Sequence, residues 1–116
     1  MRIFEGLVQN IRRRHEIRRA KRDIVNHYCG ITDYDISTGE YLARREISLA
    51  QAIKRCDIAI AMGRDAQQEV LGTYDIKGLG LEAEFSILEK MIEYIDGEKG
   101  VFSKAYDQDK KDKKEL

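Results

Sequence analysis

The chain has 116 residues, of which 42% are hydrophobic and 36% are charged, and its 21 basic and 21 acidic residues balance to a formal net charge of zero. This length predicts one domain with a modest core. Two cysteines are too few for a disulfide framework, and the N-terminal residues match neither a secretory segment nor a membrane span, so we expect a cytoplasmic protein with free thiols.

Residues 2–28 are predicted to form a long helix, because apolar side chains recur there at helical spacing. The apolar stripe is interrupted between Arg12 and Glu16. The step from Ile11 to Ile17 turns about 240° around a helix of 3.6 residues per turn, so the stripe changes direction. Either the helix bends at this point, or its two halves face different partners.

A β-hairpin is predicted near residues 32–46, after Gly30 ends the first helix. The Asp-x-x-Thr-Gly pattern at 35–39 suits a tight turn, since aspartate caps a turn and glycine adopts positive φ without strain. The flanks contain Ile, Thr and Tyr, which favour strands near 32–36 and 40–46.

The same segment has a helical alternative. Ser37 and Glu40 have the spacing of a capping box, which would open a helix reaching residue 71. The sequence leaves open whether residues 37–47 form a hairpin or a helix, and the strand-forming flanks favour the hairpin.

Two further helices are predicted over residues 49–71 and 81–96. Ser48 and Gln51 form a second capping box before an apolar run, and Gly72 ends that helix. Residues 81–96 are strongly amphipathic, with leucines, isoleucines and Phe on one face and glutamates on the other.

The expected fold is therefore mainly α with a small β-hairpin, in a single compact domain of residues 1–100. Residues 101–116 are rich in both charges and are expected to form a flexible tail. The split apolar faces of the first helix favour self-association, most simply as a two-fold dimer. The expected core comprises apolar residues on the inward faces of the helices: Ile24, Leu49, Ile53, Ile60, Val70, Phe85, Leu88 and Ile92.

Residues 12–22 form a basic cluster, with seven cations against one anion. Burying such charges would cost several kcal/mol each, so we expect the cluster to face water or an anion. Arginines on a rigid helix suit the phosphates of DNA or RNA. The candidate polyanion-binding residues are Arg12, Arg13, Arg14, Arg18, Arg19, Lys21 and Arg22.

The charges of this cluster also have an alternative partner in the acidic face of residues 81–96. Glu82, Glu89 and Glu93 would neutralise the cluster within one chain or between copies. A covered cluster would favour protein–protein contacts, and an open one would favour a polyanion.

A membrane surface is the third partner considered. Phe4, Leu7, Val8 and Ile11 precede the arginines and resemble an interfacial anchor. The apolar and basic parts follow one another in sequence, however, and do not form two faces of one segment, so this alternative is the weakest.

No catalytic or metal-binding pattern stands out. His27 and Cys29 lack a second ligand pair at suitable spacing, and Cys56 lies in an apolar helix face, so we expect neither a metal nor a Cys–His nucleophile. Asp33, Asp35 and Glu40 are explained by turn capping and solubility. No cofactor is expected.

We therefore expect a small non-enzymatic binding or regulatory accessory protein that acts through protein–protein contacts or self-association. Its partner would be another protein or a second copy of itself. Nucleic-acid binding through residues 12–22 is the alternative, and peripheral membrane association through the N-terminal helix is the second alternative.

Overall fold

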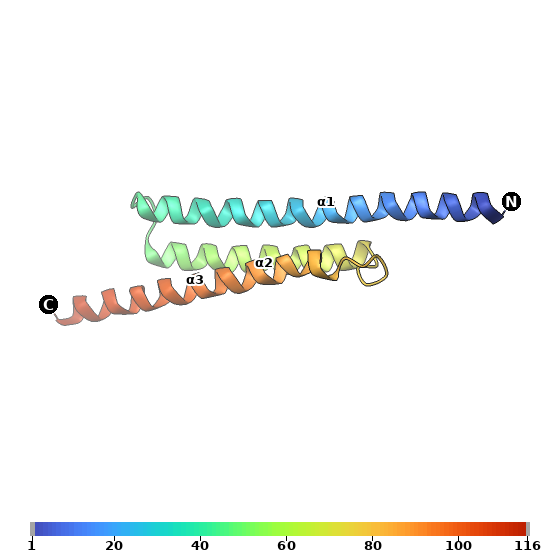
Figure 1. The fold of residues 1–116 in the computed structure, drawn as a ribbon. Helices are drawn as coiled ribbons and strands as arrows, with labels where there is room; N and C mark the ends of the chain where they lie inside the picture. The colour runs from blue at the N-terminus through green and yellow to red at the C-terminus, as the bar shows by residue number, and fades with distance from the viewer. Residues whose placement is uncertain (1, 116) are drawn as a thin grey trace.

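The computed structural model describes residues 2–115, and within them the chain forms three α-helices and no strand (Figure 1). Helix α1 spans Arg2–Ala43, α2 spans Leu49–Thr73 and α3 spans Glu82–Glu115. The chain reverses direction at each connection, and α1 and α3 both pack on α2. The helices are staggered, so α1 and α3 extend beyond the bundle at opposite ends, and the molecule measures 83 × 22 × 17 Å.

The predicted hairpin near 32–46 is wrong, because residues 32–43 continue α1 and the helix does not stop at Gly30. The residues that favour strands also repeat at helical spacing, and Ile31, Asp35 and Thr38 are buried together on one side. The hydroxyls of Ser37 and Thr38 donate to the carbonyl of Tyr34, 2.6 and 3.1 Å away, which suits a helix interior. Packing on α2 thus overrides the β preference of these side chains.

The guanidinium of Arg55 on α2 holds this part of α1 in place. Its Nε donates to Thr38 Oγ1 at 2.7 Å, and Nη2 donates to Ser37 Oγ at 2.6 Å. The same group lies 4.1 Å from the ring centroid of Tyr34. These contacts require the three side chains on one helical face, which a hairpin would separate.

Helix α1 ends in a Schellman motif. The N–H of Glu46 donates to the carbonyl of Tyr41, and the N–H of Arg45 donates to that of Leu42. Arg45 takes the left-handed position, with φ of 60°. The alternative of one helix from Ser37 through residue 71 is therefore also wrong, since the chain turns before α2.

The predicted start of α2 is confirmed. Ser48 accepts a hydrogen bond from the backbone N–H of Gln51, whose side chain accepts one in return, so the capping box forms. The buried face of α2 is made of small residues at alternating spacings of four and three, which lets both neighbouring helices approach closely. These residues are Ala52, Cys56, Ala59, Gly63, Ala66 and Val70.

Half of the predicted core is fully buried and half lies at its edge. Ile24, Val70, Leu88 and Ile92 are at most 3% exposed. Leu49, Ile53, Ile60 and Phe85 are half-buried.

The predicted end of the last helix at residue 96 is wrong, because α3 runs through Gly97 to Glu115. Phe102 and Tyr106 are half-buried in this extension. The flexibility expected of residues 101–116 concerns motion and stays a prediction. Over the part of the chain that the structure describes, no helix carries an apolar stretch long enough to span a bilayer.

Candidate binding surfaces

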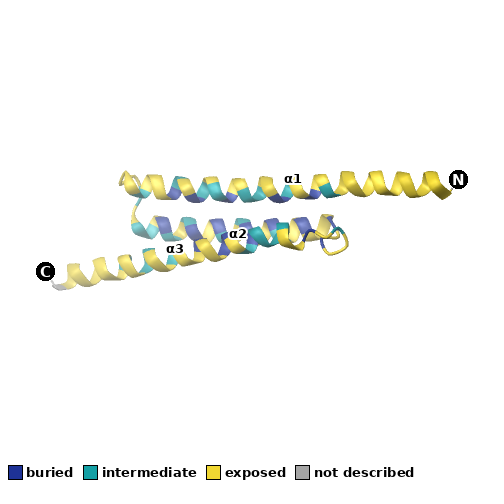
Figure 2. Ribbon diagram, in the orientation of Figure 1, coloured by how far each residue is buried: buried dark blue, intermediate teal, exposed yellow. Residues whose placement is uncertain are grey.

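The first candidate surface is the end of α1 that projects beyond the bundle. Residues 2–11, here called the overhang, are exposed at every position (Figure 2). Five large apolar side chains form a stripe along it, and Ile3 and Phe4 are 84% and 70% exposed. This overhang stripe consists of Ile3, Phe4, Leu7, Val8 and Ile11.

The overhang stripe and the buried face of α1 point in different directions. Helix α1 continues without interruption through residues 12–16, and its C-terminal half packs on the bundle while residues 2–16 are exposed. At 3.6 residues per turn, the stripe is rotated by roughly 140° from the face that contains Ala20, Ile24 and Ile31. The other two helices therefore do not cover the stripe.

The basic cluster is open to solvent. All seven cations are exposed, and within residues 2–115 no ion pair joins any of them to a carboxylate. Glu89, one of the expected partners, instead lies 2.5 Å from Arg64 Nη1 and accepts a hydrogen bond from Gln67 at 2.7 Å. These contacts lower the pKa of Glu89. Neutralisation of the cluster by the acidic face of α3 is therefore wrong for the single chain.

The cluster divides into two groups around α1. Arg12 and Arg19 border a hollow beside Tyr74, and Arg13 donates to the carbonyl of Gly78 at 3.3 Å, next to the α2–α3 loop. The helical period places the other four on the side away from the bundle, in line with the overhang stripe. These outward cations are Arg14, Arg18, Lys21 and Arg22.

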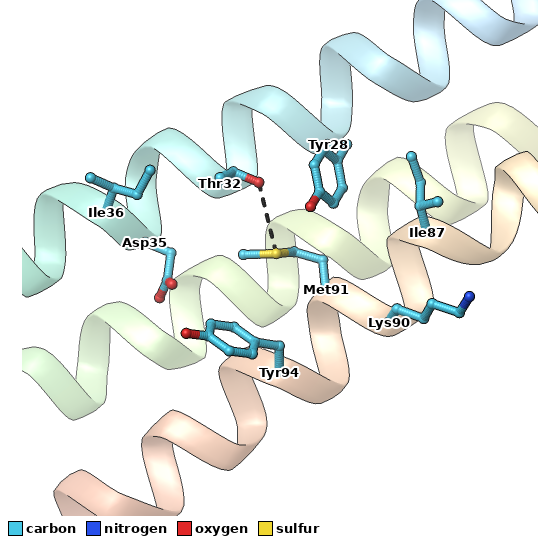
Figure 3. Close-up of a pocket in the computed structure, with 8 residues that line it drawn as sticks. All are labelled: Tyr28, Thr32, Asp35, Ile36, Ile87, Lys90, Met91 and Tyr94. Carbon is cyan, nitrogen blue, oxygen red and sulfur yellow. Dashed lines mark hydrogen bonds between the residues drawn. The ribbon is translucent and has the colours of Figure 1, made fainter.

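The second candidate surface is a groove between α1 and α3, a cavity of about 650 Å³ (Figure 3). Tyr28, Met91 and Tyr94 line it, and the Tyr94 hydroxyl points toward the carboxylate of Asp35. Asp35 is buried and lies close to the carboxyl group of Glu98. Burial, followed by this contact with Asp35, raises the pKa of Glu98 to about 7.

Sequence reasoning missed this groove. The sequence pattern predicts that Asp35 caps a turn, and this prediction is wrong because Asp35 lies within α1. The available signal was the helical period, which puts Asp35 in line with Tyr28 and Ile31 on a buried face. Glu98 and Tyr94 gave no local signal, because only the packing of α3 against α1 brings them to Asp35.

His27, Cys29 and Cys56 do not form a common site. His27 Nε2 lies 3.3 Å from a carboxylate oxygen of Glu69, Cys29 is exposed and Cys56 is buried. Burial raises the pKa of the Cys56 thiol to about 11. Residues 2–115 hold no group of three or more side chains placed to bind a metal ion.

No family model, curated protein or solved structure matches the chain. The surfaces to consider for function are the overhang stripe, the basic cluster and the groove.

Proposed function

We propose that the chain is a non-enzymatic binding protein that holds a phosphate-rich polyanion, DNA or RNA, on the basic cluster of α1. The observation that carries this proposal is that all seven cations are exposed and none pairs with a carboxylate within residues 2–115. Arginine is suited to phosphate because its planar guanidinium donates two parallel hydrogen bonds.

The density of the outward cations supports the proposal. Arg14 and Arg22 are eight residues apart, or roughly 12 Å along the helix axis. Over that length, one strand of a duplex presents about three or four phosphates, which is close to the four outward cations. A straight helix holds the backbone of these residues in fixed positions, so the backbone loses little further freedom on binding.

The experiment is fluorescence anisotropy with labelled single- and double-stranded DNA and RNA at several salt concentrations. Four to seven phosphate contacts predict a loss of affinity of roughly 10²- to 10⁴-fold between 50 and 200 mM salt. Absence of binding at low salt would contradict the proposal.

Charge reversal of Arg14, Arg18 and Arg22 tests the site itself. These three are exposed and lie outside the bundle contacts, so the fold should survive. Loss of three phosphate contacts should flatten the slope of log affinity against log salt by about 2 to 3. The matched control reverses Lys111, Lys113 and Lys114 at the far end of α3, which makes the same charge change. Equal weakening by both variants would show a net-charge effect without a site.

Self-association through the overhang stripe is the second candidate function. It is supported by five exposed apolar side chains on three successive helical turns, which is more than scattered surface residues require. Ile3, Leu7 and Ile11 are spaced by four residues and form one row of the stripe, with Phe4 and Val8 beside it. The occupant we propose is the overhang of a second copy.

An antiparallel pairing with Leu7 at the two-fold axis suits both the apolar residues and the charges. Ile3 of each copy then lies beside Ile11 of its partner, and the stripe is covered on both sides. The two basic clusters point in opposite directions, with centres roughly 30 Å apart along the axis. The pairing leaves both clusters uncovered, so the two candidate functions are compatible.

Sedimentation equilibrium of the full chain tests the pairing. We expect a concentration-dependent dimer that Leu7→Asp abolishes. The control Ile58→Asp alters an equally exposed apolar residue on α2, outside the stripe, and should leave the dimer intact. In a Cys29→Ser background, Leu7→Cys should form a disulfide-linked dimer, whereas Ile11→Cys alone should not. A monomer at all concentrations would refute the pairing.

Vesicles with and without anionic lipid form a third arm of these tests. Salt-sensitive binding to anionic vesicles that Leu7→Asp abolishes, together with no nucleic-acid binding, would assign both surfaces to a membrane. We place the protein in the cytoplasm as part of the proposal, which the two free thiols support.

A further inference from the structure

Two carboxyl groups lie close together beside the groove, and of the two only Asp35 is among the residues that line it. Asp35 of α1 is 9% exposed, and the carboxyl group of Glu98 of α3 lies close enough to it, and to the hydroxyl of Tyr94, to interact with both. Within residues 2–115, neither acid takes part in an ion pair. We call Asp35 and Glu98 the acid pair.

The nearby charged groups are engaged elsewhere. Lys99 Nζ lies 2.6 Å from Asp57, and Arg55 is bound to the hydroxyls of Ser37 and Thr38. The amine of Lys90, at the rim of the groove, points away from Asp35 (Figure 3). The thiol of Cys56 on α2 also faces the acid pair and is uncharged at neutral pH. The nearby cations therefore leave the acid pair without an ion-pair partner within residues 2–115.

The groove beside the acid pair has the size and walls of a small-molecule site. Its volume of about 650 Å³ lies within the range of about 300–1,000 Å³ that is usual for ligand pockets. Ile36, Ile87 and Met91 supply apolar surface, and Tyr28 and Tyr94 supply aromatic rings. An aromatic ring attracts a cation to its face, so the rings and carboxylates favour the same kind of ligand.

We propose that the groove between α1 and α3 binds a small organic cation, an ammonium group on an apolar body. The ammonium donates a hydrogen bond to Asp35, which lines the groove, and lies near Glu98, while the body packs on Met91 and the tyrosine rings. A bound cation lets both acids ionise side by side, which their mutual repulsion and burial otherwise oppose. A divalent metal ion suits the groove less well, because Asp35 is the one carboxylate among the residues that line it.

The test compares three ligands of nearly the same shape on the full chain. The probes are 2-phenylethylammonium, the uncharged 2-phenylethanol and the anionic 3-phenylpropanoate, titrated into ¹⁵N-labelled protein at neutral pH. We expect saturable shift changes confined to the groove for the ammonium, with at least tenfold weaker binding of the alcohol and of the anion. Equal binding of the alcohol, or no saturation by the ammonium, would overturn the proposal.

Glu98→Gln tests the acid pair, with Glu93→Gln as the matched control. Glu93 is an exposed acid on α3 and takes part in no ion pair found in residues 2–115. Glu98→Gln should weaken binding of the ammonium at least tenfold, and Glu93→Gln should leave it unchanged. Calorimetry in buffers of different ionisation enthalpy adds a second readout, because binding should release a proton from wild type between pH 6 and 7 and none from Glu98→Gln. Unchanged affinity or proton release in Glu98→Gln would overturn the proposal.

Discussion

The close contact between α2 and α3 depends on the missing side chain of Gly63. A Cβ atom at Gly63 would lie 2.5 Å from Cγ1 and 2.8 Å from Cδ1 of Ile92. Carbon atoms in ordinary contact lie about 3.5–4.0 Å apart. Ile92 is 3% exposed, and its β-branched side chain strongly prefers one χ1 rotamer in a helix, so it cannot turn aside without disturbing the core. We therefore predict that Gly63→Ala destabilises the protein.

The magnitude follows from two opposing effects. Alanine in place of glycine gains about 0.8–1 kcal/mol in a helix interior. An additional carbon in a filled core costs about 1–3 kcal/mol. The overlap with Ile92 puts Gly63→Ala toward the upper end of that cost, so the net loss is about 1–2 kcal/mol. Gly97→Ala on α3 meets nothing within 4 Å and keeps only the gain, about 0.8–1 kcal/mol.

Urea unfolding followed by far-UV circular dichroism measures both free energies. A double-mutant cycle with Ile92→Ala separates the steric cause from other effects. Ile92→Ala removes the opposing atoms, so Gly63→Ala should become stabilising in that background. The reasoning would be refuted if Gly63→Ala alone were as stable as wild type, or if its effect had the same sign in both backgrounds.

Three further predictions concern single residues. Arg45→Gly should stabilise the protein by about 0.5–1 kcal/mol in urea unfolding, because Arg45 occupies the left-handed position of the Schellman motif with φ of 60°. Burial and Asp35 raise the pKa of Glu98 from 4.5 to about 7, so the folded chain binds this proton more tightly than the unfolded chain does. The free energy of unfolding should therefore fall between about pH 4.5 and 7 by about 1–2 kcal/mol after allowance for solvent screening, and Glu98→Gln should lack this fall. In the native protein, an aromatic disulfide reagent should react promptly with exposed Cys29 and only upon unfolding with Cys56, which is buried and has a pKa raised to about 11. Prompt reaction of two thiols would contradict the burial of Cys56.

Features that depend on a few neighbouring residues could be predicted from the sequence. The Ser48–Gln51 capping box and the helix that follows it are local, since the hydrogen bonds join residues three apart. The exposure of the basic cluster is also a local consequence, because so many adjacent charges have no low-energy buried arrangement.

Features that depend on contacts between helices could not be predicted. Residues 32–43 have side chains that favour strands, and their helical state depends on burial against α2 and on the hydrogen bonds from Arg55. The acid pair joins residues 35 and 98, and no local pattern relates positions that are so far apart in the chain.

The sequence by itself determined the two properties of the N-terminal half of α1, a stripe of apolar residues and a cluster of cations, because both are set by composition and helical spacing. Only the tertiary structure decided that the apolar stripe is left uncovered within residues 2–115, since α2 and α3 pack on a different side of α1 and do not extend alongside the overhang. The groove also depends on the tertiary structure, because its walls and the acid pair come together only where α1 and α3 lie side by side. The physical reason is that spacing along one helix sets which residues share a face. What covers that face depends on how all three helices pack to bury their apolar surfaces.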